Sequence, residues 1–509
     1  MMGHRKNQVS STLPYSVFRA DWIRDEEAEA AEMSGVSLYT LMQRAGDAAF
    51  NLIRRYYPNA RHWLVLAGHG NNGGDGYIVA SLARQAGMQV SVIAIPGTRP
   101  LPAEATQARQ AWLEQGGTEL DTEALWPEHI DIIVDGLLGT GLLSAPKMPY
   151  DELIERVNHC PAPVMALDIP SGLNAETGHH EGAVIQADHT VTFIVLKPGL
   201  LTGAARDCVG HLHLDDLGLS EWVTRQVAPI QRLTAASLMR WLKPRRPVAH
   251  KGEHGRLLIV GGDEGTGGAV FMAGEAALRS GAGLVRVLTN KQYVAALVAF
   301  RPELMVQELT AVTLRQGMEW ADVVVIGPGL GQRDWGKNAL RIAENCNKSM
   351  LWDADALNLL AINPHKRQNR ILTPHPGEAA RLLNCRVSDI ESDRLLAARK
   401  LVKRYGGVVV LKGAGTVIAN EQEGLAIADV GNPGMASGGM GDVLSGIIGA
   451  FLAQKLALYD AACAGCVVHG AAADKLAKQR GTRGMLATDL MPVLSQYVNP
   501  EWISLEKTE

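Results

Sequence analysis

Short apolar runs alternate with glycine- or aspartate-containing loops and helical stretches along the chain. In the first half these runs are mostly apolar, which is typical of strands buried on both faces. They are Trp63 to Ala67, Val90 to Ile95, Ile130 to Val134, Val164 to Leu167 and Thr190 to Leu196. Strands of this kind, separated by helices, predict a parallel sheet with helices packed on it. The charged stretch Asp21 to Glu32 and the spaced apolar residues from Leu38 to Ala45 predict amino-terminal helices covering that sheet.

The pattern weakens after His211 to Asp216, where prolines flank a short helical stretch from Thr234 to Leu242. It then restarts with a helix over Gly267 to Ser280 and a second set of strands. These strands are Arg256 to Gly262, Leu284 to Leu288, Val323 to Ile326, Met350 to Trp352, Arg370 to Leu372 and Val408 to Leu411. A chain of 509 residues exceeds one core. We therefore predict two unlike α/β domains, residues 1–226 and 227–509, with the boundary between Leu219 and Leu233.

Composition and charge narrow the class of protein. With 47% hydrophobic and 20% charged residues, the chain has the composition of a globular α/β protein. Its net charge of −4 gives no electrostatic footprint for nucleic acid or an acidic membrane. Six scattered cysteines make no disulfide framework, and neither a secretion signal nor a long uncharged apolar run is present. We expect a cytoplasmic protein that is neither exported nor membrane-spanning.

A glycine-rich segment, Gly68 to Gly76, follows the first strand and opens a helix. Its backbone N–H groups at a helix start would attract phosphate. Gly68, Gly70 and Gly73 fit the spacing of a dinucleotide fingerprint, but the next strand ends at Pro96-Gly97 without the acid that binds ribose. The sequence therefore predicts a phosphate-bearing ligand here, but not a simple NAD site.

Two aspartates end neighbouring strands of the same sheet. Asp135 precedes Gly136-Leu137-Leu138-Gly139-Thr140-Gly141, and Asp168 precedes Ile169-Pro170-Ser171-Gly172. In a doubly wound sheet such strand ends converge on one crevice, so these carboxylates with Asn72 could hold a cation or move protons. Either aspartate alone could simply cap the following helix or turn. Three such loops at the same end of one sheet favour a functional site over three unrelated caps.

The second half contains a denser glycine loop, Gly431 to Gly446, before the apolar helical run Ile447 to Leu452. Glycines there let main-chain N–H groups approach an anion, and the helix start favours its charge. Asp442 would stand at the mouth of this anion hole, where it could deprotonate a hydroxyl that attacks phosphorus. A plain helix cap would explain the aspartate but not the glycines.

Three further segments of the second half follow predicted strands and should lie on the same side of the sheet as the glycine loop. Lys412 to Thr416 places a lysine in flexible backbone, which fits either a nucleotide site or a β-turn with a solvated lysine. Asp353 to Asn358 and Thr373 to Glu378 project toward the same face, with His375 either structural or substrate-reading. Cys463, Cys466 and His469, at i, i+3 and i+6 of a helix, indicate core packing, because no second pair of cysteines closes a zinc site.

The first-half motifs, together with Thr192-Phe193 and Lys197, resemble the NAD(P)H-hydrate epimerase domain, whose fold is a Rossmann-like three-layer domain with a parallel sheet. The resemblance implies a potassium ion held by Asn72, Asp135 and Ser171, and inversion at C6 of the hydrated nicotinamide ring. We assign Asp168 as the proton carrier as a hypothesis. The implied substrate-binding residues are Asn71, Asn72, Gly73, Gly74, Asp75, Gly139, Thr140, Gly141, Leu142, Leu143, Ser144, Ala145 and Asp168.

The second-half motifs, with Lys251-Gly252 and Gly327 to Gly331, resemble the ribokinase-like NAD(P)H-hydrate dehydratases over about Leu233 to Val498. In bacterial members the nucleotide is ADP, and magnesium normally accompanies it. The implied hydrate contacts are Gly267, Gly329, His375 and Asp442, with Asp442 as the base. The implied nucleotide-binding residues are Lys412, Gly413, Ala414, Gly415, Thr416, Asn432, Gly434, Ser437, Gly438, Gly439, Met440 and Gly441.

Together the two resemblances match the order of domains in bacterial bifunctional NAD(P)H-hydrate repair enzymes. We expect a homo-oligomeric enzyme that interconverts the R and S hydrates and dehydrates the S form at the expense of ADP, giving AMP and phosphate. A vitamin-precursor kinase with an accessory domain would instead prefer ATP and release a stable phosphorylated product. A scaffold protein would suit a first domain that lacked its loop acids. Preference between NADHX and NADPHX stays open.

Overall fold

The computed structural model describes residues 13–142 and 144–501. The chain divides into two compact units, residues 1–231 and 232–509. This division falls inside the predicted interval Leu219 to Leu233, a few residues after the predicted domain end at 226. Among the described residues, no helix combines the length and the apolar character needed to span a bilayer.

The first unit is built on a parallel sheet with strand order β4-β3-β2-β5-β6-β7-β8. Its strands are β2 (His62–Ala67), β3 (Gln89–Ala94), β4 (Glu119–Leu120), β5 (Ile132–Gly136), β6 (Val164–Leu167), β7 (His189–Phe193) and β8 (His211–Asp215). Its helices are α1 (Ala20–Met33), α2 (Leu38–Tyr56), α3 (Asn71–Gln85), α4 (Ala103–Glu114), α5 (Tyr150–His159), α6 (Ala205–Cys208), α7 (Ser220–Thr224) and the 3₁₀ turn η1 (Pro198–Leu200). The short strand β1 (Ser16–Val17) pairs antiparallel with the start of β9 (Ile230–Leu233).

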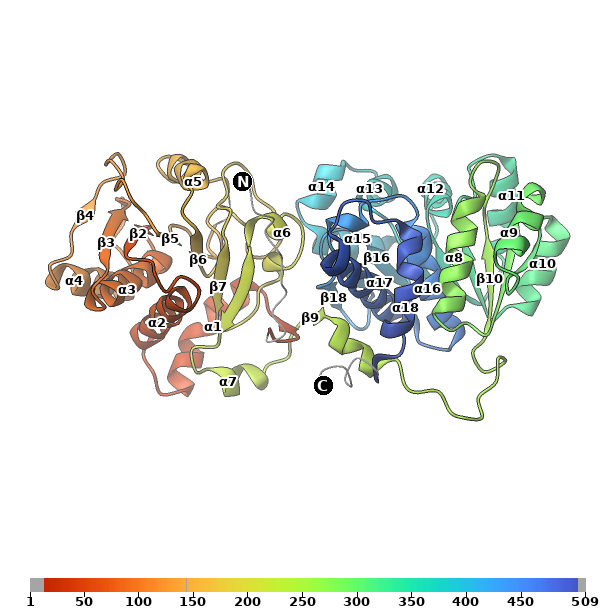
Figure 1. Ribbon diagram of the computed structural model, residues 1–509, viewed down its shortest axis with the longest axis horizontal. Helices are drawn as coiled ribbons and strands as arrows, with labels where there is room; N and C mark the ends of the chain where they lie inside the picture. The colour runs from red at the N-terminus through yellow and green to blue at the C-terminus, as the bar shows by residue number, and fades with distance from the viewer. Residues whose placement is uncertain (1–12, 143, 502–509) are drawn as a thin grey trace. The chain divides into compact units, whose positions relative to one another are not determined.

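Alternate residues of each central strand enter different cores. Trp63 and Val65 of β2 face a core shared with α1, α2, α3 and α4, whereas Leu64 and Leu66 face one shared with α5. Figure 1 shows α2 and α3 on one side of these strands and α5 on the other. Helices therefore cover both faces, which explains why the strands are apolar without alternation. The predicted Rossmann-like three-layer architecture agrees with this arrangement.

The second unit has a longer sheet, in which β9-β18-β17-β16-β15-β14-β13-β10-β11-β12 are neighbours. Its strands are β10 (Arg256–Val260), β11 (Leu284–Thr289), β12 (Met305–Glu308), β13 (Val323–Ile326), β14 (Ser349–Trp352), β15 (Arg370–Leu372), β16 (Val408–Leu411), β17 (Thr416–Ala419) and β18 (Leu425–Ala428). Strands β10 to β16 pair in parallel, and β16, β17 and β18 are antiparallel. The second domain is therefore a mixed sheet rather than a purely parallel one.

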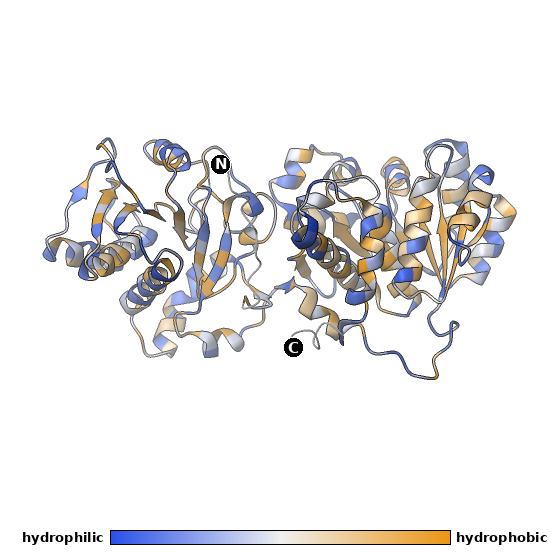
Figure 2. Cartoon of the chain, viewed as in Figure 1, coloured by the Kyte–Doolittle hydropathy of each residue, from blue (hydrophilic) through white to orange (hydrophobic). Residues whose placement is uncertain are grey.

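Helices of the second unit surround this sheet. They are α8 (Gly267–Arg279), α9 (Val294–Phe300), α10 (Ala311–Trp320), α11 (Asp334–Ala343), α12 (Asp355–Ile362), α13 (Pro376–Leu383), α14 (Val387–Glu391), α15 (Arg394–Tyr405), α16 (Met440–Ala453), α17 (Leu458–Arg480), α18 (Met491–Tyr497) and the 3₁₀ turns η2 (Ala235–Arg240), η3 (Lys291–Tyr293), η4 (Pro433–Met435) and η5 (Ala487–Leu490). One large core joins α8, α16, α17 and α18 to the sheet, and the strands there are strongly hydrophobic in Figure 2. Cys463 and Cys466 belong to this core, as their helical spacing predicted.

Most predicted elements are present with shifted ends. Val164–Leu167, Val323–Ile326, Arg370–Leu372 and Val408–Leu411 match their strands without change. The short strands β4, β12, β17 and β18 were not predicted; each has at most four residues and lies near a sheet edge or in a hairpin. Their pairing is decided by neighbours distant in sequence, which apolar periodicity does not reveal.

Three histidines pack together at the amino ends of β7 and β8. His189 Nδ1 lies 3.0 Å from His213 Nε2, and the rings of His211 and Tyr56 lie close to His189. Burial, and then the charge of His211, lowers the pKa of His189 to about 4, while Asp188 acts in the opposite direction. Burial, His189, His211 and Arg55 together lower the pKa of His213 to about 4. The folded first unit therefore favours neutral imidazoles.

We expect the first unit to lose stability as the pH falls from about 6.5 toward 4. Over this window the unfolded chain binds protons at His189 that the folded chain does not, so acid favours unfolding; at His189 the effect is roughly 2 kcal/mol. Urea unfolding at pH 7.5 and pH 5, with hydrogen exchange at β7 and β8, measures it. His189→Phe keeps the aromatic contact with Tyr56 and should show a smaller loss. An equal loss in wild type and variant would contradict this.

Candidate functional sites

The glycine-rich segment after β2 forms the start of α3 rather than a free loop. Helix α3 begins at Asn71, with Gly70 as its N-cap. A Cβ at Gly68 would meet Leu137 O at 1.7 Å, and one at Gly73 would meet Gly68 O at 2.0 Å. Glycine is required at these two positions because three backbone segments meet there. The motif therefore brings the first turn of α3 against the end of β5, where a phosphate could reach backbone N–H groups.

Asn72, Asp135 and Ser171, which were predicted to bind potassium, lie together. Ser171 donates to Asp135 through both its hydroxyl (2.6 Å) and its backbone N–H (2.8 Å). Leu138 O accepts from Asn72 Nδ2 at 3.0 Å and lies 3.3 Å from Ser171 Oγ. Asn72 Oδ1 is buried and accepts no hydrogen bond from the described residues. Three helix and strand ends thus gather oxygen atoms in one buried place.

Asp135 is a fully buried carboxyl in this cluster. Burial raises its pKa to about 6, even though the hydrogen bonds from Ser171 and from Leu137 N favour the charged form. A cation beside Asp135 would stabilise the carboxylate.

Asp168 lies at the end of β6 with a positive φ of 61°. Left-handed backbone is uncommon outside glycine and clusters at functional sites. Its Oδ1 accepts from Lys197 Nζ at 2.5 Å and from Thr192 Oγ1 at 3.0 Å. The Lys197 side chain is only 3% exposed. The structure thus explains the Thr192 and Lys197 part of the motif, to which the sequence analysis gave no separate role.

The charge of Asp168 affects two further acids, Asp75 and Glu27. Burial raises the pKa of Asp75 well above its ordinary value, and the charges of Asp168 and Glu27 raise it further. Burial and then the charge of Asp168 raise the pKa of Glu27, which comes from α1. Sequence reasoning missed Glu27, because it assigned the amino-terminal helices only a covering role. Glu27 is one of several half-buried residues in this charge-rich stretch, so its proximity to Asp168 is visible only after α1 is placed.

The remaining predicted epimerase residues form a rim. Gly139, Thr140, Gly141, Leu142, Ser144 and Ala145 lie between β5 and α5 and are partly or fully exposed. A Cβ at Gly139 would contact the side chain of Asn72 at 3.4 Å, so the rim begins beside the oxygen cluster. Leu143 lies outside the described residues.

In the second unit, Lys412 lies in the turn between β16 and β17, as the turn interpretation predicted, but it is not solvated. Its Nζ donates to Asp353 Oδ1 at 3.0 Å and lies 3.9 Å from Glu378 Oε2. Asp353 Oδ2 also accepts from Ser445 of α16 at 2.8 Å. The ends of β14, β15 and β16 therefore converge on one lysine.

Asp442 lies in the first turn of α16, whose N-cap is Gly439 with φ 89°. Burial, and then the charge of Asp353, raises its pKa to about 7, and Lys412 acts in the opposite direction. A Cβ at Gly441 would stand 3.3 Å from Lys412 Nζ. The helix start, with its outward N–H groups, thus lies beside a lysine and a carboxyl that titrates near neutral pH.

The glycine loop divides into two parts. Its first part closes on itself: Asn432 Oδ1 accepts from Gly434 N, Asn432 Nδ2 donates to Asp474, and Met435 N and Ala436 N donate within the loop. Ser437 Oγ donates to Met485 O. Anion-facing N–H groups are therefore expected from Gly438 onward and at the start of α16, a narrower set than the sequence suggested. Thr416 Oγ1 likewise serves the turn, donating to Gly413 O.

The residues predicted to contact the hydrate lie at neighbouring loop ends. Thr266 Oγ1, next to the α8 start at Gly267, donates to Gly329 O at 2.8 Å. His375 is the N-cap of α13 and accepts from Gly377 N through its ring. Burial and then the charge of Lys412 lower the pKa of His375. His375 is therefore both a structural cap and a neighbour of the lysine site, so neither sequence interpretation excludes the other.

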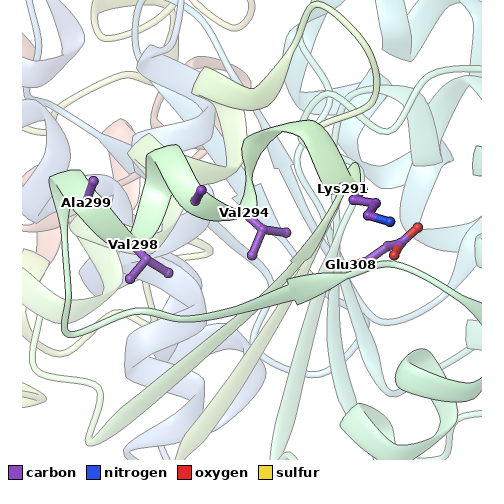
Figure 3. Close-up of a pocket in the computed structure, with 6 residues that line it drawn as sticks. Lys291, Val294, Val298, Ala299 and Glu308 are labelled. Atoms are coloured by element: carbon purple, nitrogen blue, oxygen red, sulfur yellow. The ribbon is translucent and has the colours of Figure 1, made fainter.

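A separate apolar hollow lies on α9 and β12 (Figure 3). Its lining includes Val294, Val298 and Ala299, with Lys291 and Glu308 at one end. No predicted site residue lines it, and it lacks a gathering of polar groups that would orient a substrate. We do not assign either reaction to it.

Sequence and structure comparisons agree with this geometry. The family model for NAD(P)H-hydrate dehydratase matches residues 257–496, and that for the YjeF-related protein N-terminus matches residues 38–199. The bifunctional NAD(P)H-hydrate repair enzyme Nnr of Escherichia coli is 64% identical, with 98% of this chain and 96% of that protein covered. The Leishmania braziliensis repair enzyme is 48% identical, with 96% and 95% covered.

A solved structure shows the same fold in the second unit. The ribokinase-like superfamily protein of Enterococcus faecalis is 31% identical, with a TM-score of 0.50 over 54% of this chain and 96% of that chain. The second unit is therefore ribokinase-like, as expected from its glycine loop and aspartate. By its full-length similarity to the E. coli and Leishmania proteins, this chain belongs to the family of bifunctional NAD(P)H-hydrate repair enzymes.

Proposed function

We propose that the first unit interconverts the R and S forms of hydrated NADH and NADPH, and that the second dehydrates the S form with ADP as phosphoryl donor. One observation carries this: Asp442, with a pKa near 7, stands at the start of α16 beside Lys412, Asp353 and the glycine loop. A base beside an anion-binding helix start suits transfer of a phosphoryl group to a hydroxyl. Family membership supports the hydrate as the substrate, and its C6 hydroxyl would then be the acceptor.

In the proposed dehydration, Asp442 removes the proton of the C6 hydroxyl while that oxygen attacks the β-phosphorus of ADP. The new O–P bond forms as the bond to AMP breaks. Phosphate then leaves C6 with the bonding electrons, the ring nitrogen supplies an electron pair, and loss of a C5 proton restores the double bond. The N–H groups from Gly438 onward and Lys412 would stabilise the phosphoryl charge, and Gly267, Gly329 and His375 would orient the ring.

Asp353 and Glu378 fit a magnesium ion at the nucleotide. Burial, with a further contribution from the charge of Asp353, raises the pKa of Glu378 to about 7, while Lys412 acts in the opposite direction. Two buried carboxyls at one place supply the oxygen ligands that Mg²⁺ prefers. When bound, the ion would neutralise charge on the phosphates. Asp353 and Glu378 would hold it, with Lys412 released from them to the nucleotide.

For the epimerase, two carboxyls in different environments suit acid and base roles. Asp168 accepts a hydrogen bond from Lys197, whereas burial and the charges of Asp168 and Glu27 raise the pKa of Asp75 well above its ordinary value, which favours its protonated form. Asp75 would give a proton to the departing C6 hydroxyl. Asp168 would take one from the water that adds to the opposite face. The substrate would lie across the start of α3 and the rim after β5.

The oxygen cluster of Asn72, Asp135 and Ser171 fits a potassium ion. Asn72 Oδ1 is a buried acceptor without a donor in the described part of the chain, and Asp135 is a buried carboxyl. Carbonyl and carboxylate oxygens can replace the hydration shell of K⁺. These residues would hold the ion and so fix the loop after β5 against α3.

Potassium should stabilise the first unit. At about ten times Kd, an ion that binds only the folded state adds about 1.4 kcal/mol. Thermal unfolding in potassium chloride and in choline chloride of equal ionic strength measures the difference. Asn72→Ala should abolish it, whereas the exposed Asn51→Ala should not. Equal unfolding temperatures in the two salts would remove the potassium proposal and leave the rest standing.

A coupled assay on mixed hydrate epimers tests the function as a whole. Recovery of reduced-cofactor absorbance should require ADP and exceed half of the hydrate supplied, because epimerisation feeds the R form into dehydration. A stable phosphorylated product formed with ATP would favour the kinase interpretation instead. Parallel reactions with NADHX and NADPHX give the preference. The six free cysteines agree with a cytoplasmic location, and self-association stays a prediction.

A further inference from the structure

Two histidines and an aspartate meet at the amino-terminal ends of β2 and β5 in the first unit, away from the loops of the candidate epimerase site. His62 is the first residue of β2, and Asp131 immediately precedes β5. The two strands are paired with Trp63 beside Ile132, so the register sets His62 next to Asp131. His129 comes from the segment before β5. The far end of β2, where the glycine motif begins, is roughly 16 Å away along the strand.

The three side chains present their ligand atoms to one another. Asp131 Oδ2 lies 3.3 Å from His62 Nδ1, and Asp131 Oδ1 lies 3.0 Å from His129 Nε2. The two rings meet edge to face with centroids 5.0 Å apart. One ligand atom from each residue lies within 4.8 Å of the others.

Asp131 is held in place by the backbone. Arg61 N and His62 N donate to its Oδ2 at 2.7 and 2.9 Å. These two hydrogen bonds lower the pKa of Asp131 to about 2, so it is a carboxylate at any neutral pH. Its other oxygen, Oδ1, faces His129. A fixed carboxylate between two imidazoles is a pre-organised set of metal ligands.

We propose that His62, His129 and Asp131 bind a divalent transition-metal ion of the Zn²⁺ type, at a site separate from both reactions. Ligands at about 2.0–2.1 Å from a tetrahedral ion lie about 3.3 Å apart, close to the carboxylate–imidazole separations present. Two nitrogen ligands favour Zn²⁺, Co²⁺ or Ni²⁺ over Mg²⁺ or Ca²⁺. His129, 70% exposed, can turn to close the site, and water completes the coordination.

Imidazole binds such an ion in its neutral form. In the neutral form each ring has one nitrogen with a free lone pair. With the ion bound, His62 would carry its proton on Nε2 and His129 on Nδ1, so that Nδ1 and Nε2 respectively bind the ion in place of their contacts with Asp131. The bound ion would link the segment before β5 to the start of β2 and so stabilise this end of the sheet.

Cobalt titration of the full chain tests the site. After removal of metals by a chelator, the protein is titrated with Co²⁺ at pH 7.5 in excess Mg²⁺, which occupies oxygen-only sites. We expect a saturable visible absorbance that Zn²⁺ abolishes. His129→Ala should weaken this binding at least about 10-fold, since it removes one ligand. Both enzymatic activities should persist, because His129 touches neither reaction site.

Matched variants keep the result interpretable. His250→Ala removes an equally exposed histidine that pairs with Glu253 in the second unit, and it should leave the cobalt spectrum unchanged. Asp131→Asn is less suitable, because Asp131 also anchors Arg61 and His62. If His129→Ala binds Co²⁺ with the affinity and spectrum of the wild type, the three residues are only a surface ion-pair cluster and the proposal fails.

Discussion

Asp442→Ala should lower the dehydratase rate by about 10²- to 10⁴-fold, the usual contribution of a positioned base, and leave epimerisation at its wild-type rate. The separation is expected because Asp442 and the epimerase acids belong to different compact units. The readout is ADP-dependent recovery of reduced cofactor from S hydrate, with epimer exchange followed separately. Asp442→Asn removes the basic oxygen but keeps the shape of the side chain, so it should lose nearly as much.

The pH profile gives an independent check on Asp442. Its pKa is raised to about 7, chiefly by burial, so the base is protonated below this pH and free above it. The wild-type rate should therefore rise through pH 7 and then level off. Asp389→Ala is a matched control, because Asp389 is another first-turn acid but pairs with Arg386 on the surface. Retained turnover in Asp442→Ala would refute the assigned role.

Asp168→Asn should lower epimerisation by about 10²-fold or more and leave dehydration of pure S hydrate intact. Asparagine tolerates the positive φ at this position and keeps an oxygen that can accept from Lys197, so the substitution removes mainly charge and basicity. The measurement is exchange between R and S hydrates, resolved chromatographically. Thermal unfolding of the first unit separates a chemical defect from a folding one.

Asp47→Asn is the control for Asp168→Asn, because Asp47 is an exposed acid on α2 whose carboxylate accepts a hydrogen bond from Asn51 Nδ2. It should change neither activity. If Asp168→Asn epimerises at the wild-type rate, Asp168 does not carry the proton. Asp75, the other acid in the site, would then be the next residue to substitute.

The two predictions also separate the competing interpretations. A kinase with an accessory domain would lose product formation in Asp442→Ala but would never return reduced cofactor from hydrate. A scaffold protein would catalyse neither reaction, so neither substitution would change a measured activity. Only a repair enzyme loses one half-reaction with each variant. Family membership over nearly the whole chain favours this last outcome.

The sequence by itself determined the class of fold and marked the loops of both candidate sites. Buried parallel strands must be apolar along their length, so Val164–Leu167 and Val323–Ile326 could be identified without neighbours. Glycines at Gly68 and Gly73 mark places where backbone approaches too closely for a side chain, and Gly441 lies against the end of Lys412. Aspartates at the carboxyl ends of parallel strands lie at one end of their sheet, which is how the sequence grouped Asp135 with Asp168 in the first unit and placed Asp353 with its own loops in the second.

Only the tertiary structure decided which groups face one another and in what state of charge. Lys412 could have been a solvated turn residue, and contact with Asp353 and Glu378 shows that it is not. The position of α1 brings the charge of Glu27 close to Asp168 in the candidate epimerase site. The raised pKa values of Asp75 and Asp442 arise mainly from burial. The pairing of His62 with Asp131 required the register of β2 and β5. Such properties depend on contacts between segments distant in sequence, and local patterns carry no record of those contacts.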